Sequence, residues 1–206
     1  MTPMTNFMNK SRRSFLIAAG AGALTVALPV PALATTRNSA RRLVERVVAD
    51  INTIIDSGKS EAAMLDDFEQ IFVSYADVNT IARYALGVEG RSASDRQLRS
   101  FTAAFQRYMA VKYGRRFREF IGGRVEVQSA RAVKSYFEVE TLAYLQGSAP
   151  FEVVFQVSDR SGEEKFFNMF IEGLNMLLSE RTEIGAMLDR RNGDLDAMIA
   201  DLQKLG

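Results

Sequence analysis

Length, composition and charge exclude several classes of protein. The chain has 206 residues, with 26 Lys and Arg against 25 Asp and Glu, and it contains no Cys, His or Trp. Without Cys there is no disulfide and no thiol nucleophile. Without His there is no Ser-His-Asp triad, and the commonest metal ligand is missing. A net charge of +1 gives no reason to expect nucleic acid as a partner. The length fits one domain of ordinary size, and a binding protein is favoured over an enzyme.

The first 34 residues differ from the rest. Lys10, Arg12 and Arg13 are the only charged residues there, and an apolar run rich in Ala and Gly follows over residues 15–28. The stretch ends in Ala32-Leu33-Ala34, a small-residue pattern typical of a signal-peptide cleavage site. Because a membrane-spanning helix needs about 20 apolar residues, a cleaved export signal is favoured over a permanent anchor.

The arginine pair indicates the export route. Residues 11–16, Ser-Arg-Arg-Ser-Phe-Leu, resemble the twin-arginine signal, and a general secretory signal is the alternative. Cleavage after Ala34 leaves residues 35–206 as a single domain. Since the three leader charges are all positive, cleavage changes the net charge from +1 to −2. We therefore expect a periplasmic protein with no membrane span after cleavage.

Four apolar patterns at helical spacing follow the leader. They cover residues 40–56, 64–72, 78–86 and a long segment from Ser92 or Ser94 to about residue 121. Asp77 is placed to cap the third helix, and Gly87 to end it. The apolar arc of the long helix is wide and unusually aromatic.

After Gly123 the apolar period changes to two, which predicts strands. The runs cover residues 125–128, 137–145, 151–157 and 166–171, with turns at 147–150 and 159–162. Short links between the runs predict hairpins and thus an antiparallel sheet. Helical spacing returns in residues 176–188 and 195–202. The expected fold is α+β: an antiparallel sheet of about four strands with helices on one face.

Two groups of charged residues are candidates for chemistry. Four carboxylates near the second helix keep a small enzyme open as an alternative, although capping or solvation is the commoner role: Asp66, Asp67, Glu69 and Asp77. A basic cluster at the end of the long helix is either a solvated face or a mouth that attracts phosphate or anionic headgroups: Lys112, Arg115, Arg116, Arg118 and Arg124. No phosphate loop, nucleophile elbow or metal-ligand pattern occurs.

Aromatic residues supply either a packed core or the lining of a cavity. The chain has 14 Phe and 6 Tyr. Periodicity places them on helices that face an apolar sheet, and it leaves both alternatives open.

Five segments, in this order, carry a resemblance to a known family. They are Ala-Arg-Tyr-Ala-Leu-Gly at 82–87, Phe-Thr-Ala-Ala-Phe at 101–105, Tyr-Gly-Arg-Arg-Phe at 113–117, Phe-Ile-Glu-Gly-Leu at 170–174 and Glu-Arg-Thr-Glu-Ile at 180–184. Together they resemble the MlaC, or toluene-tolerance, family of periplasmic phospholipid-binding proteins, over nearly all of residues 35–206. The family often has Asp where Asn168 stands and Ser where Asn175 stands, and it has Trp residues that this chain lacks.

The resemblance implies a lipid carrier without catalytic residues or a cofactor. Such proteins hold phospholipid acyl chains in a cavity between sheet and helices and leave the headgroup near solvent. They pass lipid between an outer-membrane lipoprotein complex and an inner-membrane ABC lipid transporter complex. One branch of the family is associated with hopanoid synthesis, so a polycyclic lipid is the alternative cargo, and an adaptor without cargo is a further alternative.

Periodicity then gives a hypothesis for the binding site. The expected helical wall consists of Phe101, Phe105, Tyr108, Met109 and Tyr113. The expected sheet wall consists of Phe137, Val139, Phe151, Val153, Phe155 and Val157. Arg115 and Arg116 are expected at the mouth, near the headgroup.

Overall fold

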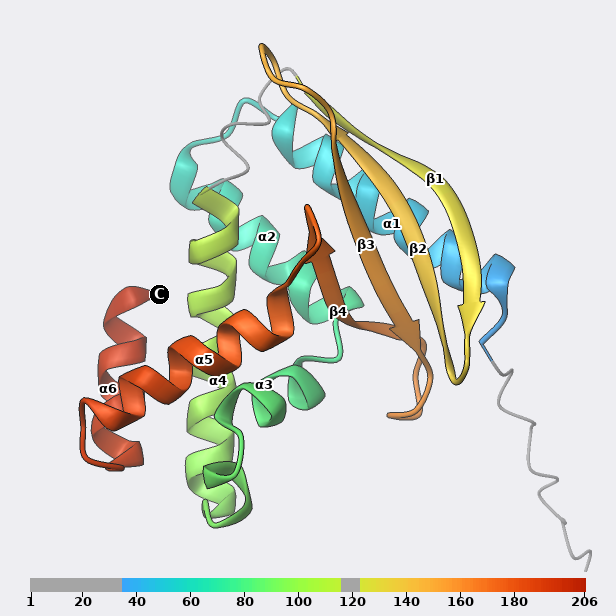
Figure 1. The fold of residues 1–206 in the computed structure, drawn as a ribbon. Coiled ribbons are helices and arrows are strands. Elements are labelled where there is room, and N and C mark those ends of the chain that lie inside the picture. Colours follow the sequence, from blue (N-terminus) through green and yellow to red (C-terminus); the bar gives the residue numbers. More distant parts are fainter. Residues whose placement is uncertain (1–34, 116–122) are drawn as a thin grey trace, which may run out of the picture. The chain divides into compact units, whose positions relative to one another are not determined.

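The computed structural model describes residues 35–115 and 123–206, and Figure 1 shows the order of the elements. Each described α-helix begins after a residue whose side chain accepts a hydrogen bond from a backbone N–H of the first turn; these residues are Thr36, Ser60, Asp77, Ser94, Asn175 and Asp194. The helices are α1 (Arg37–Ile55), α2 (Glu61–Tyr75), α3 (Val78–Leu86), α4 (Asp95–Gly114), α5 (Met176–Asp189) and α6 (Leu195–Leu205), with a short 3-10 helix, η1, at Glu89–Arg91.

Helix ends follow the sequence signals closely in two places. The predicted cap at Asp77 is confirmed, and Gly87 ends α3 with a positive φ of 70°. Ser94 rather than Ser92 opens α4, where it forms a capping box with Gln97. The α-helix ends at Gly114. The predicted continuation to about residue 121 falls on residues 116–122, which lie outside the described residues.

Among the described residues, five strands form one antiparallel sheet in the order β1-β2-β3-β4-β5. They are β1 (Arg124–Val133), β2 (Tyr136–Tyr144), β3 (Phe151–Ser158), β4 (Lys165–Ile171) and β5 (Leu174–Asn175). The first four were expected from the sequence. The fifth was not, because two residues are too short to show a period.

The turn between β4 and β5 is a two-residue hairpin connection. Glu172 and Gly173 both have positive φ, 49° and 78°, as a type I′ turn requires. The ladder pairs Phe170–Asn175 and Ile171–Leu174 flank the turn. The geometry therefore fixes Glu172 at the tip of a tight hairpin.

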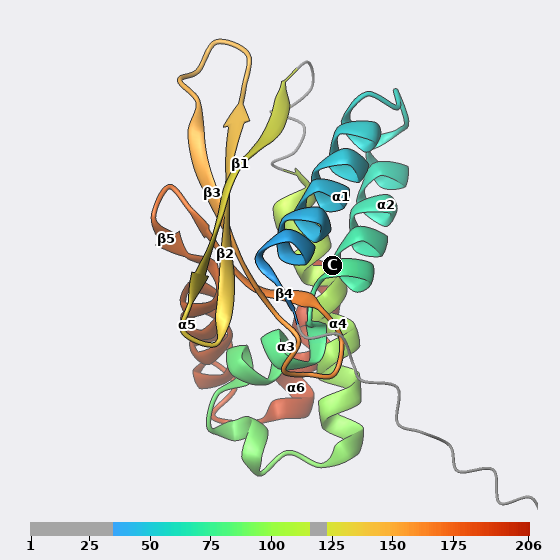
Figure 2. The same cartoon turned by 90° about the vertical axis from the view of Figure 1, so that its right-hand side faces the viewer.

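Helices α1 and α2 form the predicted helical layer on one face of the sheet, whereas the start of α5 is hydrogen-bonded to Asn168 on the other face. Figure 2 shows α1 and α2 together on one side of the strands. Helix α1 packs against β1, β2 and β3, α2 packs against α1 and α4, and α6 packs against α4. A parallel bridge between Ala76 and Phe166, with a 2.8 Å hydrogen bond from Asp77 N to Phe166 O, joins the α2–α3 connection to β4.

A buried polar pair on the opposite face holds the start of α5. Asn168 Nδ2 donates to Gln156 Oε1 at 3.1 Å, and Asn168 Oδ1 accepts from Leu177 N at 3.1 Å. Asn175, the N-cap of α5, accepts from Leu178 N. Asn168 and Asn175 thus both hold the junction between the sheet and α5.

Candidate functional site

A cavity of about 580 Å³ lies between the helix-facing side of the sheet and the helices. This size is within the usual range of ligand sites. Protein interiors are otherwise close-packed, with few voids larger than a water molecule. The cavity is therefore much larger than the ordinary packing gaps of a protein interior.

Most of the helical wall comes from three helices, α1, α2 and α4. Helix α1 contributes Val47, Val48 and Ile51, α2 contributes Phe68, Ile71 and Phe72, and α4 contributes its last turns, Met109, Ala110, Tyr113 and Gly114. These positions recur every three or four residues, so each helix turns one apolar stripe toward the cavity.

The sheet wall uses alternate residues of the strands. Thr141 pairs with Val153 across β2 and β3, and Phe155 pairs with Met169 across β3 and β4, so these side chains share one face. The strands and their connections contribute Val125, Thr141, Ala143, Leu145, Ser148, Ala149, Phe151, Val153, Phe155, Phe166, Met169, Ile171 and Glu172, and α5 adds Met176. The Thr141 hydroxyl donates to Val153 O at 2.8 Å, so this deep polar group is already bonded.

Three of the lining residues are exposed to solvent and define the mouth: Ser148, Ala149 and Glu172. Ser148 and Ala149 lie in the β2–β3 turn, and Glu172 lies in the β4–β5 turn. Among the described lining residues, Glu172 is the only one with a charged side chain. The site is thus an apolar chamber that opens past a carboxylate.

A partly buried ion pair joins α4 to α5 next to the cavity wall. Glu180 of α5 is fully buried, and its Oε1 accepts from Lys112 Nζ at 2.7 Å and from Tyr113 OH at 2.6 Å. Lys112 also binds Tyr108 OH and Glu183.

Burial and the nearby Glu180 charge raise the pKa of Tyr108. Burial acts to raise the pKa of Glu183, but hydrogen bonds from Lys112 and Tyr108 hold that pKa below its usual range. The network fixes Tyr113, which lines the cavity, to α5.

Five of the eleven expected wall residues line this cavity. They are Met109 and Tyr113 on α4, and Phe151, Val153 and Phe155 on β3. Whether they contact a bound lipid stays a prediction.

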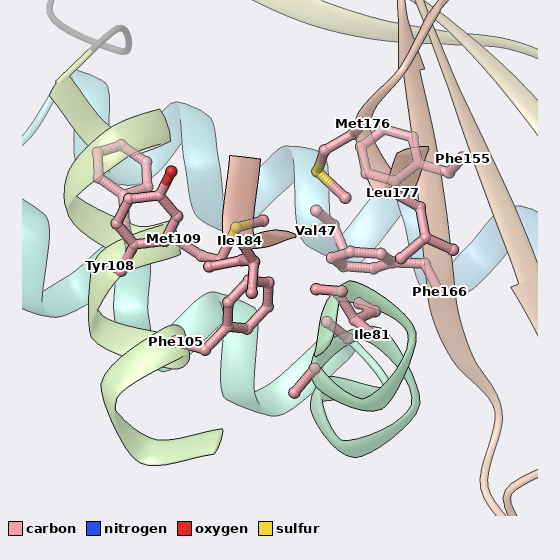
Figure 3. Close-up of a cluster of buried hydrophobic side chains, with 14 of the residues drawn as sticks. Val47, Ile81, Phe105, Tyr108, Met109, Phe155, Phe166, Met176, Leu177 and Ile184 are labelled. Atoms are coloured by element: carbon pink, nitrogen blue, oxygen red, sulfur yellow. The ribbon is translucent and has the colours of Figure 1, made fainter. Parts of the chain in front are cut away.

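The other six expected wall residues lie elsewhere in the core. Phe101 and Phe105 are fully buried and stack on each other with ring centroids 5.5 Å apart. Figure 3 shows Phe105 and Tyr108 on α4 packed toward Ile184 of α5, in a cluster that also includes Ile81 of α3. Val139 and Val157 are fully buried and Phe137 is partly buried against the same core, without lining the cavity. The early part of α4 thus packs on other helices, and only its end faces the cavity.

The two arginines expected at the mouth are placed differently from the lining residues. Arg115 is exposed and directly follows Gly114, which lines the cavity, but Arg115 is not itself a lining residue. Arg116 lies outside the described residues.

Sequence reasoning missed the contribution of α1 and α2. The apolar positions of α1 and α2 predicted helices, but the helical wall of the cavity was assigned to α4 alone because α4 is rich in aromatic residues. One sequence signal could have indicated that α2 lines the cavity. Ile71 and Phe72 extend the apolar stripe of Met64, Leu65 and Phe68, which makes the stripe longer than packing against a single helix requires.

The candidate carboxylates near α2 serve structural roles. Asp66 and Glu69 both bind Arg107, Asp67 binds Lys59, and Asp77 caps α3. In the described part of the chain, no group of three or more acidic residues is arranged to hold a metal ion. No helix among residues 35–115 and 123–206 is both long and apolar enough to cross a membrane.

The family model described as MlaC protein matches residues 41–204. The chain belongs to the MlaC family. A solved structure of the phospholipid-binding protein from Ralstonia solanacearum, in complex with a phospholipid, matches with a TM-score of 0.63 and 19% sequence identity, over 79% of this chain and 98% of that chain. At this identity the match shows a shared fold, and it agrees with the expected α+β architecture of the MlaC family.

Proposed function

We propose that this protein is a periplasmic phospholipid carrier that holds acyl chains in the cavity between sheet and helices. The observation that carries the proposal is the cavity itself, which is lined mainly by apolar side chains and whose one charged side chain among the described lining residues, Glu172, lies at the mouth. Membership of the MlaC family and the phospholipid in the related Ralstonia structure support the same cargo class. A binding or transport role, rather than catalysis, fits a chain without His or Cys.

The energetics suit reversible carriage. Burying one 16-carbon chain is worth about 13 kcal/mol at ~0.8 kcal/mol per methylene. A bilayer offers nearly the same burial, so exchange between membrane and cavity is close to neutral. A carrier of this kind needs a matching cavity and docking surfaces but no reactive side chain.

The cellular route is part of the proposal. Residues 1–34 are proposed to be a cleaved twin-arginine export signal, and residues 35–206 to be the working domain. The carrier is proposed to move lipid between an outer-membrane lipoprotein complex and an inner-membrane ABC lipid transporter complex. Arg115, which is exposed next to the wall residue Gly114, is proposed to contact the phosphate of the headgroup.

The test is a lipid analysis of protein purified after expression of the full-length chain. Organic extracts are analysed by mass spectrometry, and about one phospholipid or more per protein is expected. Lipid-free protein would contradict carriage, and a polycyclic lipid in place of phospholipid would contradict the proposed cargo.

A cavity variant tests the location. Val153→Asp places a carboxylate in the apolar wall, where an unpaired charge is costly and acyl chains are excluded. Loss of most bound lipid is expected, without loss of export. The matched control is Val73→Asp, because Val73 lies on α2 with 39% of its surface exposed and does not line the cavity. Equal lipid content in both variants would refute the cavity as the site.

A further inference from the structure

Glu172 places a carboxylate at the mouth of the cavity. Glu172 is exposed, and the described residues that line the cavity with it include no Lys or Arg. No described residue forms an ion pair with its carboxylate. Ser148 is the other polar side chain at the mouth, on the β2–β3 turn. A cation that reaches this mouth therefore meets an available carboxylate.

The backbone holds this carboxylate in a defined place. Glu172 occupies the first central position of the type I′ turn, and its N–H donates to Glu152 O at 3.0 Å. Ladder pairs on β4 and β5 flank it directly. A positive φ disfavours most residues other than Gly, Asn and Asp. The conformation of the turn therefore does not explain why Glu occupies position 172.

We propose that Glu172 binds the protonated amine of a zwitterionic lipid headgroup, as in phosphatidylethanolamine, and thereby sets the headgroup preference of the carrier. The inference rests on the proposed function, because acyl chains in the cavity bring the headgroup to the mouth. The carboxylate attracts an ammonium group and repels a headgroup that carries only negative charge. Since this ion pair is exposed to water, its effect on relative binding is about two- to fivefold.

Two substitutions separate charge from backbone effects. Glu172→Gln keeps the size of the side chain and removes the charge. Glu172→Asn removes the charge and suits the turn, because Asn-Gly is favoured in type I′ turns. The matched control is Glu152→Gln, an exposed carboxylate on β3 that does not line the cavity.

The experiment measures headgroup selection directly. Delipidated protein is incubated with vesicles of equal phosphatidylethanolamine and phosphatidylglycerol, re-isolated, and its bound lipids are quantified by mass spectrometry. Wild type and Glu152→Gln are expected to enrich phosphatidylethanolamine, and both Glu172 variants to lower that enrichment about two- to fivefold at unchanged total lipid.

The outcomes distinguish this inference from the proposed function. An unchanged headgroup ratio in Glu172→Gln, with lipid still bound, would overturn the role of Glu172 and leave carriage intact. Failure of wild-type protein to take up any lipid would overturn both.

Discussion

At the scale of single residues, Glu180 stands out because it is a carboxylate buried in the core. It is fully buried; one carboxylate oxygen is shared between Lys112 and Tyr113, and the other, Oε2, is buried without a hydrogen-bond partner among the described residues. A buried charge that keeps its counter-ion is tolerated, whereas one that loses it is strongly destabilising. The Lys112–Glu180 pair therefore sets how firmly α5 holds the end of α4.

We predict that Lys112→Met lowers the free energy of unfolding by about 2–4 kcal/mol, because it leaves the Glu180 carboxylate buried without a cation. The double variant Lys112→Met/Glu180→Gln should recover most of this loss, since the neutral amide still offers an oxygen to Tyr113. Urea unfolding of both proteins measures the difference. Glu183 loses Lys112 in both, so its contribution cancels. Equal stability of the single and double variants would show that the buried charge is not the cause.

At the scale of elements, the approach of α2 to α4 forms part of the cavity wall. A Cβ added at Gly114 would lie 2.6 Å from Leu65 Cδ2 and 3.3 Å from Phe68 Cδ2. Both neighbours are buried on α2. The absence of a side chain at Gly114 thus lets the two helices close the wall at this point.

We predict that Gly114→Ala lowers the free energy of unfolding by about 1–3 kcal/mol, because the added methyl group overpacks the α2–α4 contact. The matched control is Gly185→Ala on α5, where a Cβ would meet nothing within 4 Å. That change should raise stability by about 0.5–1 kcal/mol through helix propensity alone. Chemical denaturation of both variants tests the contrast, and a stabilised Gly114→Ala protein would contradict the close approach.

The same scale shows what sequence could predict. Capping residues and alternating strands are local signals, so Asp77, Ser94 and the first four strands were predictable. The part of an apolar helix that borders a void is not a local property. Phe105 and Met109 lie one turn apart on the same stripe of α4, yet Phe105 packs against other helices while Met109 lines the cavity. Which residues of α4 line the cavity depends on where the sheet and α5 contact α4. Neither the helical period nor the strand period of the apolar residues contains this information.

At the scale of the whole molecule, the cavity has to be reconciled with the stability of the fold. Scaled from small cavities at about 24 cal/mol per Å³, an empty void of about 580 Å³ would cost ~14 kcal/mol. That is as large as the net stability of an ordinary domain. The open mouth admits water and reduces this cost, but the wall side chains still lack the dispersion contacts that a ligand supplies. Bound lipid should therefore act as part of the core.

We predict that delipidated protein melts about 5–10 °C below lipid-loaded protein. Ligand at about 100 times its dissociation constant stabilises by about 2.7 kcal/mol, and each kcal/mol shifts Tm by about 2–4 °C in a protein of this size. Adding phosphatidylethanolamine vesicles back should restore the higher Tm, as followed by circular dichroism. The Val153→Asp protein, whose wall carries a charge, should show little response to the same vesicles. Equal Tm values for loaded and stripped wild type would mean that the helices and sheet hold the cavity open without help from its cargo.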